Sequence, residues 1–133
     1  GGYMDNYQQN ACEALWRKYN GRGRIKVFAS TDGGVFPLPG AGVKLFIYSY
    51  GQLCLLSEST TDISGISEFN ELPALPKENS QVPSAGYAGL TYNVEINHPA
   101  LGNQRTAIPV FDRVKTVWKV SPLIAFMLSV ESR

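Results

Sequence analysis

Histidine is almost absent from this chain of 133 residues, and its scarcity excludes several kinds of active site. His98 is the single histidine, so a histidine-rich metal site is excluded. A serine–histidine–aspartate triad would have to use His98, which stands directly before Pro99, and no G-x-S-x-G turn is present to expose a nucleophile. A phosphate-binding loop, a dinucleotide fingerprint, a zinc motif and a calcium loop are missing as well. We therefore predict a protein that is not an enzyme, has no cofactor or metal, and uses His98 as an exposed turn residue.

An excess of charge of one sign is also missing. Twelve Lys and Arg residues stand against 11 Asp and Glu residues, which gives a formal net charge of +1. Such a balance provides no electrostatic footprint for nucleic acid or an anionic membrane. The apolar run from Pro122 to Val130 is too short to cross a bilayer. We expect neither a nucleic-acid partner nor a membrane span.

Cysteine occurs only twice, as Cys12 and Cys54, without the spacing of a metal site. Free cysteine behaves as a small buried hydrophobe, so two buried thiols are the preferred interpretation. A disulfide between the two is the alternative. Two cysteines do not settle the redox compartment.

Apolar side chains recur at helical spacing only near the start of the chain. Residues 3–19 carry Tyr7, Ala11 and Leu15 on one stripe, which predicts an amphipathic helix. Asn20 and Gly21 form a good stop, because both tolerate a left-handed backbone.

After Gly23 the pattern changes to alternation with period two, which predicts β-strands. The predicted strands are 24–30, 43–50, 53–60, 66–72, 92–97, 106–111 and 116–120, with 123–130 as an edge strand or a crossing tail. Asp62 and Gly65 suit a tight turn, because an Asp side chain accepts backbone N–H groups two residues on and Gly takes a positive φ. Asp62 and Glu68 also have the oxygen atoms to hold a cation, but the turn is the preferred interpretation. The sequence thus predicts an all-β, antiparallel β-sandwich of approximately seven strands with one N-terminal α-helix.

The order of the motifs along the chain is similar to that of a known family. The motifs are GRIKVF, PLPGAGV, TDISGISEFNELP, YNVEI, IPVFD and SPL. They resemble the carboxypeptidase-regulatory-like family of transthyretin-like (prealbumin-like) β-sandwiches, and most closely the version in clostridial spore cortex-lytic and peptidoglycan-binding proteins. The resemblance divides the chain into an N-terminal helix (1–20), the sandwich (21–124) and a C-terminal tail or edge strand (125–133). No peptidoglycan-binding repeat is present.

The resemblance implies a non-catalytic accessory or interaction module of a bacterial envelope or spore-wall protein, with an extracellular, envelope or spore location. Its implied partner is another protein or a cell-wall glycan. Two alternatives stay open. One is a structural subunit that self-associates through edge strands or the apolar tail. The other is a carbohydrate-binding module, including one for peptidoglycan.

An aromatic set is the candidate partner-binding surface. Phe28, Phe46, Tyr48 and Tyr50 share the strand phase opposite the predicted core. Exposed aromatic rings can stack on sugars or hold a protein partner. The preferred interpretation is that the N-terminal helix covers this set with Tyr7, Leu15 and Trp16, since a helix must bury its apolar stripe. The loop 73–90 is a second candidate contact surface.

Overall fold

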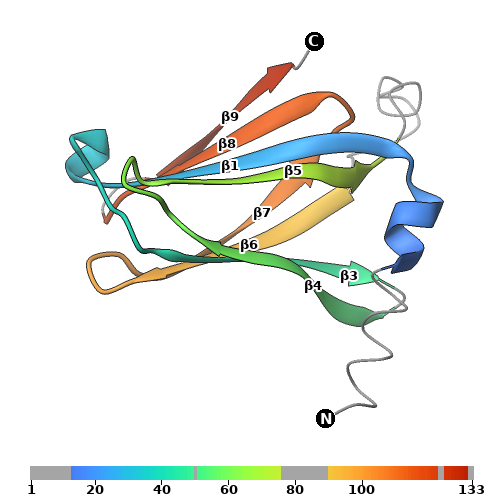
Figure 1. The fold of residues 1–133 in the computed structure, drawn as a ribbon, viewed down its shortest axis with the longest axis horizontal. Coiled ribbons are helices and arrows are strands. Elements are labelled where there is room, and N and C mark those ends of the chain that lie inside the picture. Colours follow the sequence, from blue (N-terminus) through green and yellow to red (C-terminus); the bar gives the residue numbers. More distant parts are fainter. Residues whose placement is uncertain (1–12, 50, 76–89, 123–124, 132–133) are drawn as a thin grey trace.

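The computed structural model describes residues 13–49, 51–75, 90–122 and 125–131, and it is a sandwich of two β-sheets (Figure 1). The first sheet contains β1 (Gly21–Thr31), the two-residue β2 (Phe36–Pro37), β5 (Ile66–Ala74), β8 (Val114–Val120) and β9 (Ala125–Glu131). The second sheet has the order β4 (Gln52–Thr60), β3 (Gly42–Ser49), β6 (Leu90–His98) and β7 (Gly102–Val110). The predicted all-β sandwich is confirmed. The two strands beyond the seven predicted ones are β2 and β9, and β9 is the edge strand offered as one reading of 123–130.

Among the described residues, the pairing departs from a purely antiparallel sandwich at two places, and one of these is an isolated parallel bridge between Leu75 and Phe111. β1 lies between β5, to which it is antiparallel, and β8, to which it is parallel. The remaining pairs are antiparallel, and hairpins connect β3 to β4, β6 to β7 and β8 to β9. A parallel neighbour requires a long crossover. Here that crossover contains the whole second sheet, so β1 and β8 meet only after the chain has passed through both layers.

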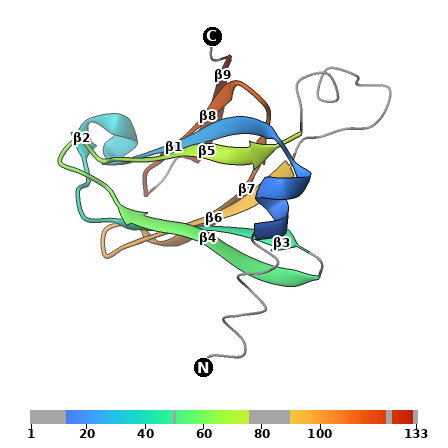
Figure 2. The same cartoon turned by 45° about the vertical axis from the view of Figure 1, so that its right-hand side comes forward.

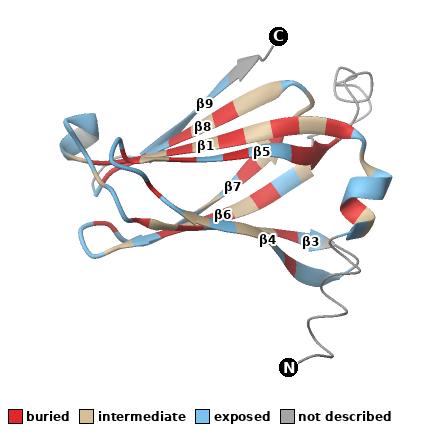
Figure 3. Cartoon of the chain, viewed as in Figure 1, coloured by how far each residue is buried: buried red, intermediate tan, exposed pale blue. Residues whose placement is uncertain are grey.

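Alternation within each strand supplies the core. Ile25, Val27 and Ala29 of β1 are fully buried, and Figure 3 shows buried and less buried residues alternating along β1. The other inward positions predicted from the period are buried too: Val43, Leu45, Ile47, Tyr92, Val94, Ile96, Trp118 and Val120. Removal of these apolar side chains from water is the main force that holds the two sheets together.

The described part of the helix, residues 13–18, closes one end of the sandwich (Figures 1 and 2). Leu15 is only 4% exposed and belongs to the core. The position of the predicted stop is confirmed, since β1 begins at Gly21, but neither Asn20 nor Gly21 has the positive φ on which the prediction was based. Arg22 fixes the corner, because its Nη1 donates to the carbonyls of Tyr19 at 2.8 Å and Gly21 at 2.7 Å.

The predicted turn at the other end is confirmed. The carboxylate of Asp62 accepts hydrogen bonds from the backbone N–H groups of Ser64 at 2.9 Å and Ile66 at 3.0 Å. Gly65 has a φ of 76°. Thr61 links this turn to the Pro37–Gly40 segment, because its hydroxyl donates to the Leu38 carbonyl at 2.6 Å and accepts from Ala41 N–H at 2.9 Å. Hydrogen bonds through Thr61 therefore hold the Asp62–Gly65 turn and the Pro37–Gly40 segment together.

The preferred interpretation of the cysteines is wrong. Cys54 is buried on β4 and takes part in a disulfide. The chain has one other cysteine, Cys12, which lies outside the described residues. Spacing along the chain could not reveal the bond, because a disulfide depends on the distance between two Cα atoms in the fold.

Candidate functional site

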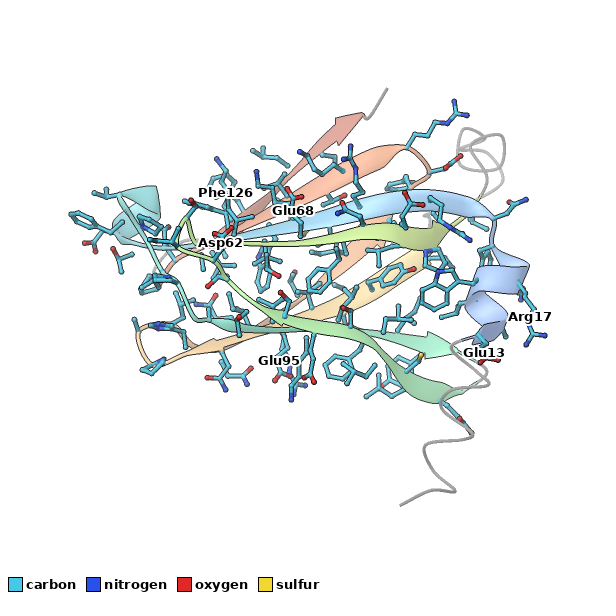
Figure 4. The ribbon with its side chains drawn as sticks, viewed as in Figure 1. Glu13, Arg17, Asp62, Glu68, Glu95 and Phe126 are labelled. Carbon is cyan, nitrogen blue, oxygen red and sulfur yellow. The ribbon has the colours of Figure 1, made fainter. Side chains whose placement is uncertain are left out.

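The aromatic set is divided between the two outer faces of the sandwich. Phe46 and Tyr48 lie on β3, in the second sheet, and Phe28 lies on β1, in the first. Tyr50 lies outside the described residues. Figure 4 shows Glu95 of the second sheet pointing out of one side of the molecule, and Glu68 and Phe126 of the first sheet on the other. The outward phase of these aromatic residues was predicted, but only the topology assigns them to different faces.

Of the three helical side chains predicted to cover the aromatic set, Tyr7 lies outside the described residues, and Leu15 and Trp16 leave Tyr48 largely exposed. Tyr48 is 66% exposed and Trp16 is 38% exposed. The described helical residues bury Leu15 at the end of the core. Leu15, Ile47 and Tyr48 meet at a small hollow of about 130 Å³ at the rim of the sheet face.

A hollow on the outer face of the second sheet has a volume of about 360 Å³, and we call it the Tyr48 hollow. Its lining residues are Phe46, Tyr48, Leu53, Asn93, Val94, Glu95, Arg105, Thr106 and Ala107. One cross-strand row explains its shape. In that row Phe46 stands beside Asn93, and Asn93 stands beside Ala107. The two short side chains next to the large ring leave a depression in the sheet surface.

The neighbouring cross-strand row is charged, with alternating sign. It runs through Glu58, Lys44, Glu95 and Arg105. Arg105 Nε lies 2.9 Å from Glu95 Oε2, and Asn103 Nδ2 donates to Glu95 Oε1 at 3.2 Å. The Glu95 side chain is only 17% exposed, whereas that of Arg105 is 76% exposed. Glu95 is thus held in place beneath a solvent-facing guanidinium.

Sequence reasoning missed Asn93, Glu95 and Arg105 as members of a site. The outward phase of Asn93 and Glu95 was readable from the alternation with Tyr92, Val94 and Ile96, whereas Arg105 lies one residue before the predicted strand 106–111. Their proximity to Tyr48 depends on the pairing of β6 with both β3 and β7, which is not readable from one strand.

A second hollow, of about 350 Å³, lies on the outer face of the first sheet, and we call it the Phe126 hollow. Phe28, Lys119 and Phe126 line it together with Ser30, Gly34, Val120 and Ser121. Lys119 Nζ lies 5.8 Å from the centre of the Phe126 ring, within the range of a cation–π contact. Phe28 therefore does border a hollow, but one on the opposite side from Tyr48.

The single histidine lies at the end of β6, next to a turn. His98 is used in a turn, where its Nδ1 accepts a hydrogen bond from Ala100 N–H at 2.9 Å. The described part of the chain contains no group of three His, Cys, Asp or Glu side chains that could hold a metal ion. None of the described helices is long and apolar enough to cross a membrane.

Comparison with known proteins identifies the fold. No family model and no curated protein matches the sequence. Sea bream transthyretin in complex with thyroxine matches in structure, with a TM-score of 0.51 and 14% identity over 81% of this chain and 95% of that chain. Transthyretin from Sparus aurata matches with a TM-score of 0.50 and 14% identity, over 82% and 97% of the two chains. The fold is transthyretin-like.

At this level of identity the likeness establishes the architecture of the transthyretin-like sandwich alone. It agrees with the broad family resemblance of the motifs. The finer likeness to spore cortex-lytic and peptidoglycan-binding proteins is not addressed by these two matches and stays a prediction.

Proposed function

We propose that this transthyretin-like sandwich is a non-catalytic binding module of a bacterial envelope or spore-wall protein. Its partner is another protein or a cell-wall glycan, held at the Tyr48 hollow. One observation carries the proposal: an exposed tyrosine and a fixed Glu95–Arg105 pair border a preformed hollow on paired strands. Sites built on regular strands hold their groups in place better than sites on loops.

The envelope setting rests on two further observations. The first is the order of sequence motifs that resembles spore and peptidoglycan-binding proteins. The second is the disulfide at Cys54, since disulfides persist in oxidising environments outside the cytosol.

Co-sedimentation with isolated bacterial cell walls tests the proposal. The walls are used whole and as separated glycan and protein fractions. We expect the protein to sediment with one fraction, and Tyr48→Ala to weaken binding about tenfold, as expected for loss of a central aromatic contact. Phe126→Ala, on the opposite face, is the matched control and should bind like the parent.

Two results would contradict the proposal. Loss of binding in Phe126→Ala with retention in Tyr48→Ala would put the site on the other sheet. Release of soluble wall fragments at a rate that His98→Ala abolishes would make the protein an enzyme.

A structural, self-associating subunit is the second candidate, and β9 favours it. Phe126, Met127 and Leu128 are consecutive in β9 and are 47%, 43% and 47% exposed, so both faces of this strand are apolar and open. β9 pairs with β8 along one side, and no described strand occupies its other side. Such an edge is a template for pairing with another chain.

Light scattering tests this second candidate. A molar mass that rises with protein concentration in the parent, and stays that of a monomer in Leu128→Lys, supports assembly through β9. A parent that stays monomeric at every concentration contradicts self-association.

A further inference from the structure

We propose that the Tyr48 hollow binds a neutral oligosaccharide. This inference rests on the proposed function and narrows its ligand to one chemical class. The argument uses the shape of the hollow, the groups in its polar wall and the balance of charge around it.

The shape suits a sugar ring. Its lining combines the large apolar side chains of Phe46, Tyr48 and Leu53 with the smaller side chains of Asn93 and Ala107. Pyranose rings have an apolar C–H face that packs against an aromatic ring, while their hydroxyl groups point outward to polar partners. The volume of about 360 Å³ falls within the roughly 300–1,000 Å³ typical of small-molecule sites. Since Tyr48 and Arg105 are both solvent-facing, further sugar units can continue along the sheet surface.

The polar residues of the hollow, Asn93, Glu95 and Arg105, can each form two hydrogen bonds to neighbouring hydroxyl groups of a sugar. The Glu95 carboxylate accepts hydrogen bonds, and the Asn93 amide both donates and accepts. Arg105 contacts Glu95 through Nε, so its two terminal nitrogens stay available to donate to a ligand. Because Arg105 and Asn103 hold the carboxylate of Glu95, binding costs little ordering of that group.

Charge balance favours a neutral ligand. The row of Glu58, Lys44, Glu95 and Arg105 contains two negative and two positive groups. An anion bound at the terminal nitrogens of Arg105 would lie beside the negative charge of Glu95, and a cation bound at Glu95 would lie beside the positive charge of Arg105. A wholly apolar ligand would remove water from the Glu95–Arg105 pair and could not replace the hydrogen bonds that the pair makes to that water. An extended peptide gains its affinity from backbone pairing at a sheet edge, and this hollow lies on a sheet face.

Backbone-amide NMR titration of the intact chain tests the inference. The neutral probes are cellotetraose, xylotetraose and tetra-N-acetylchitotetraose; the acidic probe is tetragalacturonate, and the peptide probe is a peptidoglycan stem pentapeptide. We expect a neutral tetrasaccharide to shift the amides of Phe46, Asn93 and Arg105. Tyr48→Ala and Glu95→Gln should each raise the dissociation constant at least tenfold, and Phe126→Ala should leave it unchanged. Glu95→Gln keeps the size of the side chain, so its unfolding midpoint should stay near that of the parent.

The outcomes separate the inference from the function on which it rests. Shifts at these amides with only the acidic sugar or the peptide overturn the neutral-saccharide ligand, while the hollow remains the binding surface. No shift with any probe, together with Tyr48-dependent sedimentation on the wall protein fraction, also overturns the ligand class and leaves the proposed function standing. No shift and no Tyr48-dependent sedimentation overturn both.

Discussion

Gly65 is required at its position for two separate reasons at the scale of the single residue. Its φ of 76° lies in the left-handed region, and a Cβ there would clash with the carbonyl oxygen of Ala29. Gly40 has the same φ but open space around it, so it is the matched control. We expect Gly40→Ala to lower the free energy of unfolding by about 1–2 kcal/mol. Gly65→Ala should cost clearly more, about 3 kcal/mol or above, because backbone must also move.

Urea denaturation of the two glycine variants measures this difference. If both variants lost the same free energy of unfolding, the close approach of β1 to the turn would make no additional contribution to stability.

Tyr92 makes stability depend on pH in the alkaline range. Its ring is fully buried and its hydroxyl donates to the Pro73 carbonyl at 2.5 Å. Burial raises the pKa of Tyr92 well above its ordinary value, and the positive charge of Arg22 opposes this only in part. Below about pH 10 the hydroxyl is protonated in both the folded and the unfolded chain, so its contribution is complete. Above that pH only the unfolded chain ionises, and the free energy of unfolding falls.

Tyr92→Phe isolates this effect. At pH 8 the variant should be less stable by about 1 kcal/mol, the worth of one hydrogen bond. Between pH 9 and pH 11 the variant should lose less stability than the parent, because it has no Tyr92 hydroxyl that can ionise in the unfolded chain. The other tyrosines titrate in both proteins, so their effect cancels in the comparison. Parallel pH slopes in urea denaturation would show that Tyr92 ionises as readily in the folded chain.

At the scale of the element, the strands could be predicted closely and their partners could not. Period-two alternation is local, so the buried phase of β1, β3, β6 and β8 followed directly from the sequence. Sheet membership depends on topology, and for that reason Phe28 was grouped with Phe46 although the two lie on opposite faces. The helix was predicted with its stop, but its seat at the end of the sandwich depends on where the two sheets leave the core open.

The residues of the candidate site could likewise be predicted from the sequence only where a single strand was enough to identify them. Tyr48 was identified because an outward aromatic residue is visible in one strand. Its polar neighbours come from β6 and β7, and only the register of three strands brings Asn93, Glu95 and Arg105 beside it.

At the scale of the whole molecule, the disulfide at Cys54 should contribute substantially to stability. A disulfide limits the freedom of the unfolded chain and contributes typically about 2–4 kcal/mol. We expect a reducing agent to lower the unfolding temperature of the parent, and to have no effect on Cys54→Ala. Mass spectrometry after alkylation of the unfolded, unreduced chain should find no modified cysteine. Alkylation at Cys54 under those conditions would contradict the bond.

The parallel pairing of β1 with β8 has a consequence for how the protein is made. β1 leaves the ribosome before its antiparallel partner β5, which follows after β2, β3 and β4. The other side of β1 has to wait for β8 (Val114–Val120), which is made only after β5, β6 and β7. Until β8 has been made, one edge of β1 stays open, and strand edges exposed during synthesis invite wrong pairing. The first sheet therefore cannot form completely before β8 has left the ribosome, and a ribosome stalled between β7 and β8 would hold a chain prone to aggregate.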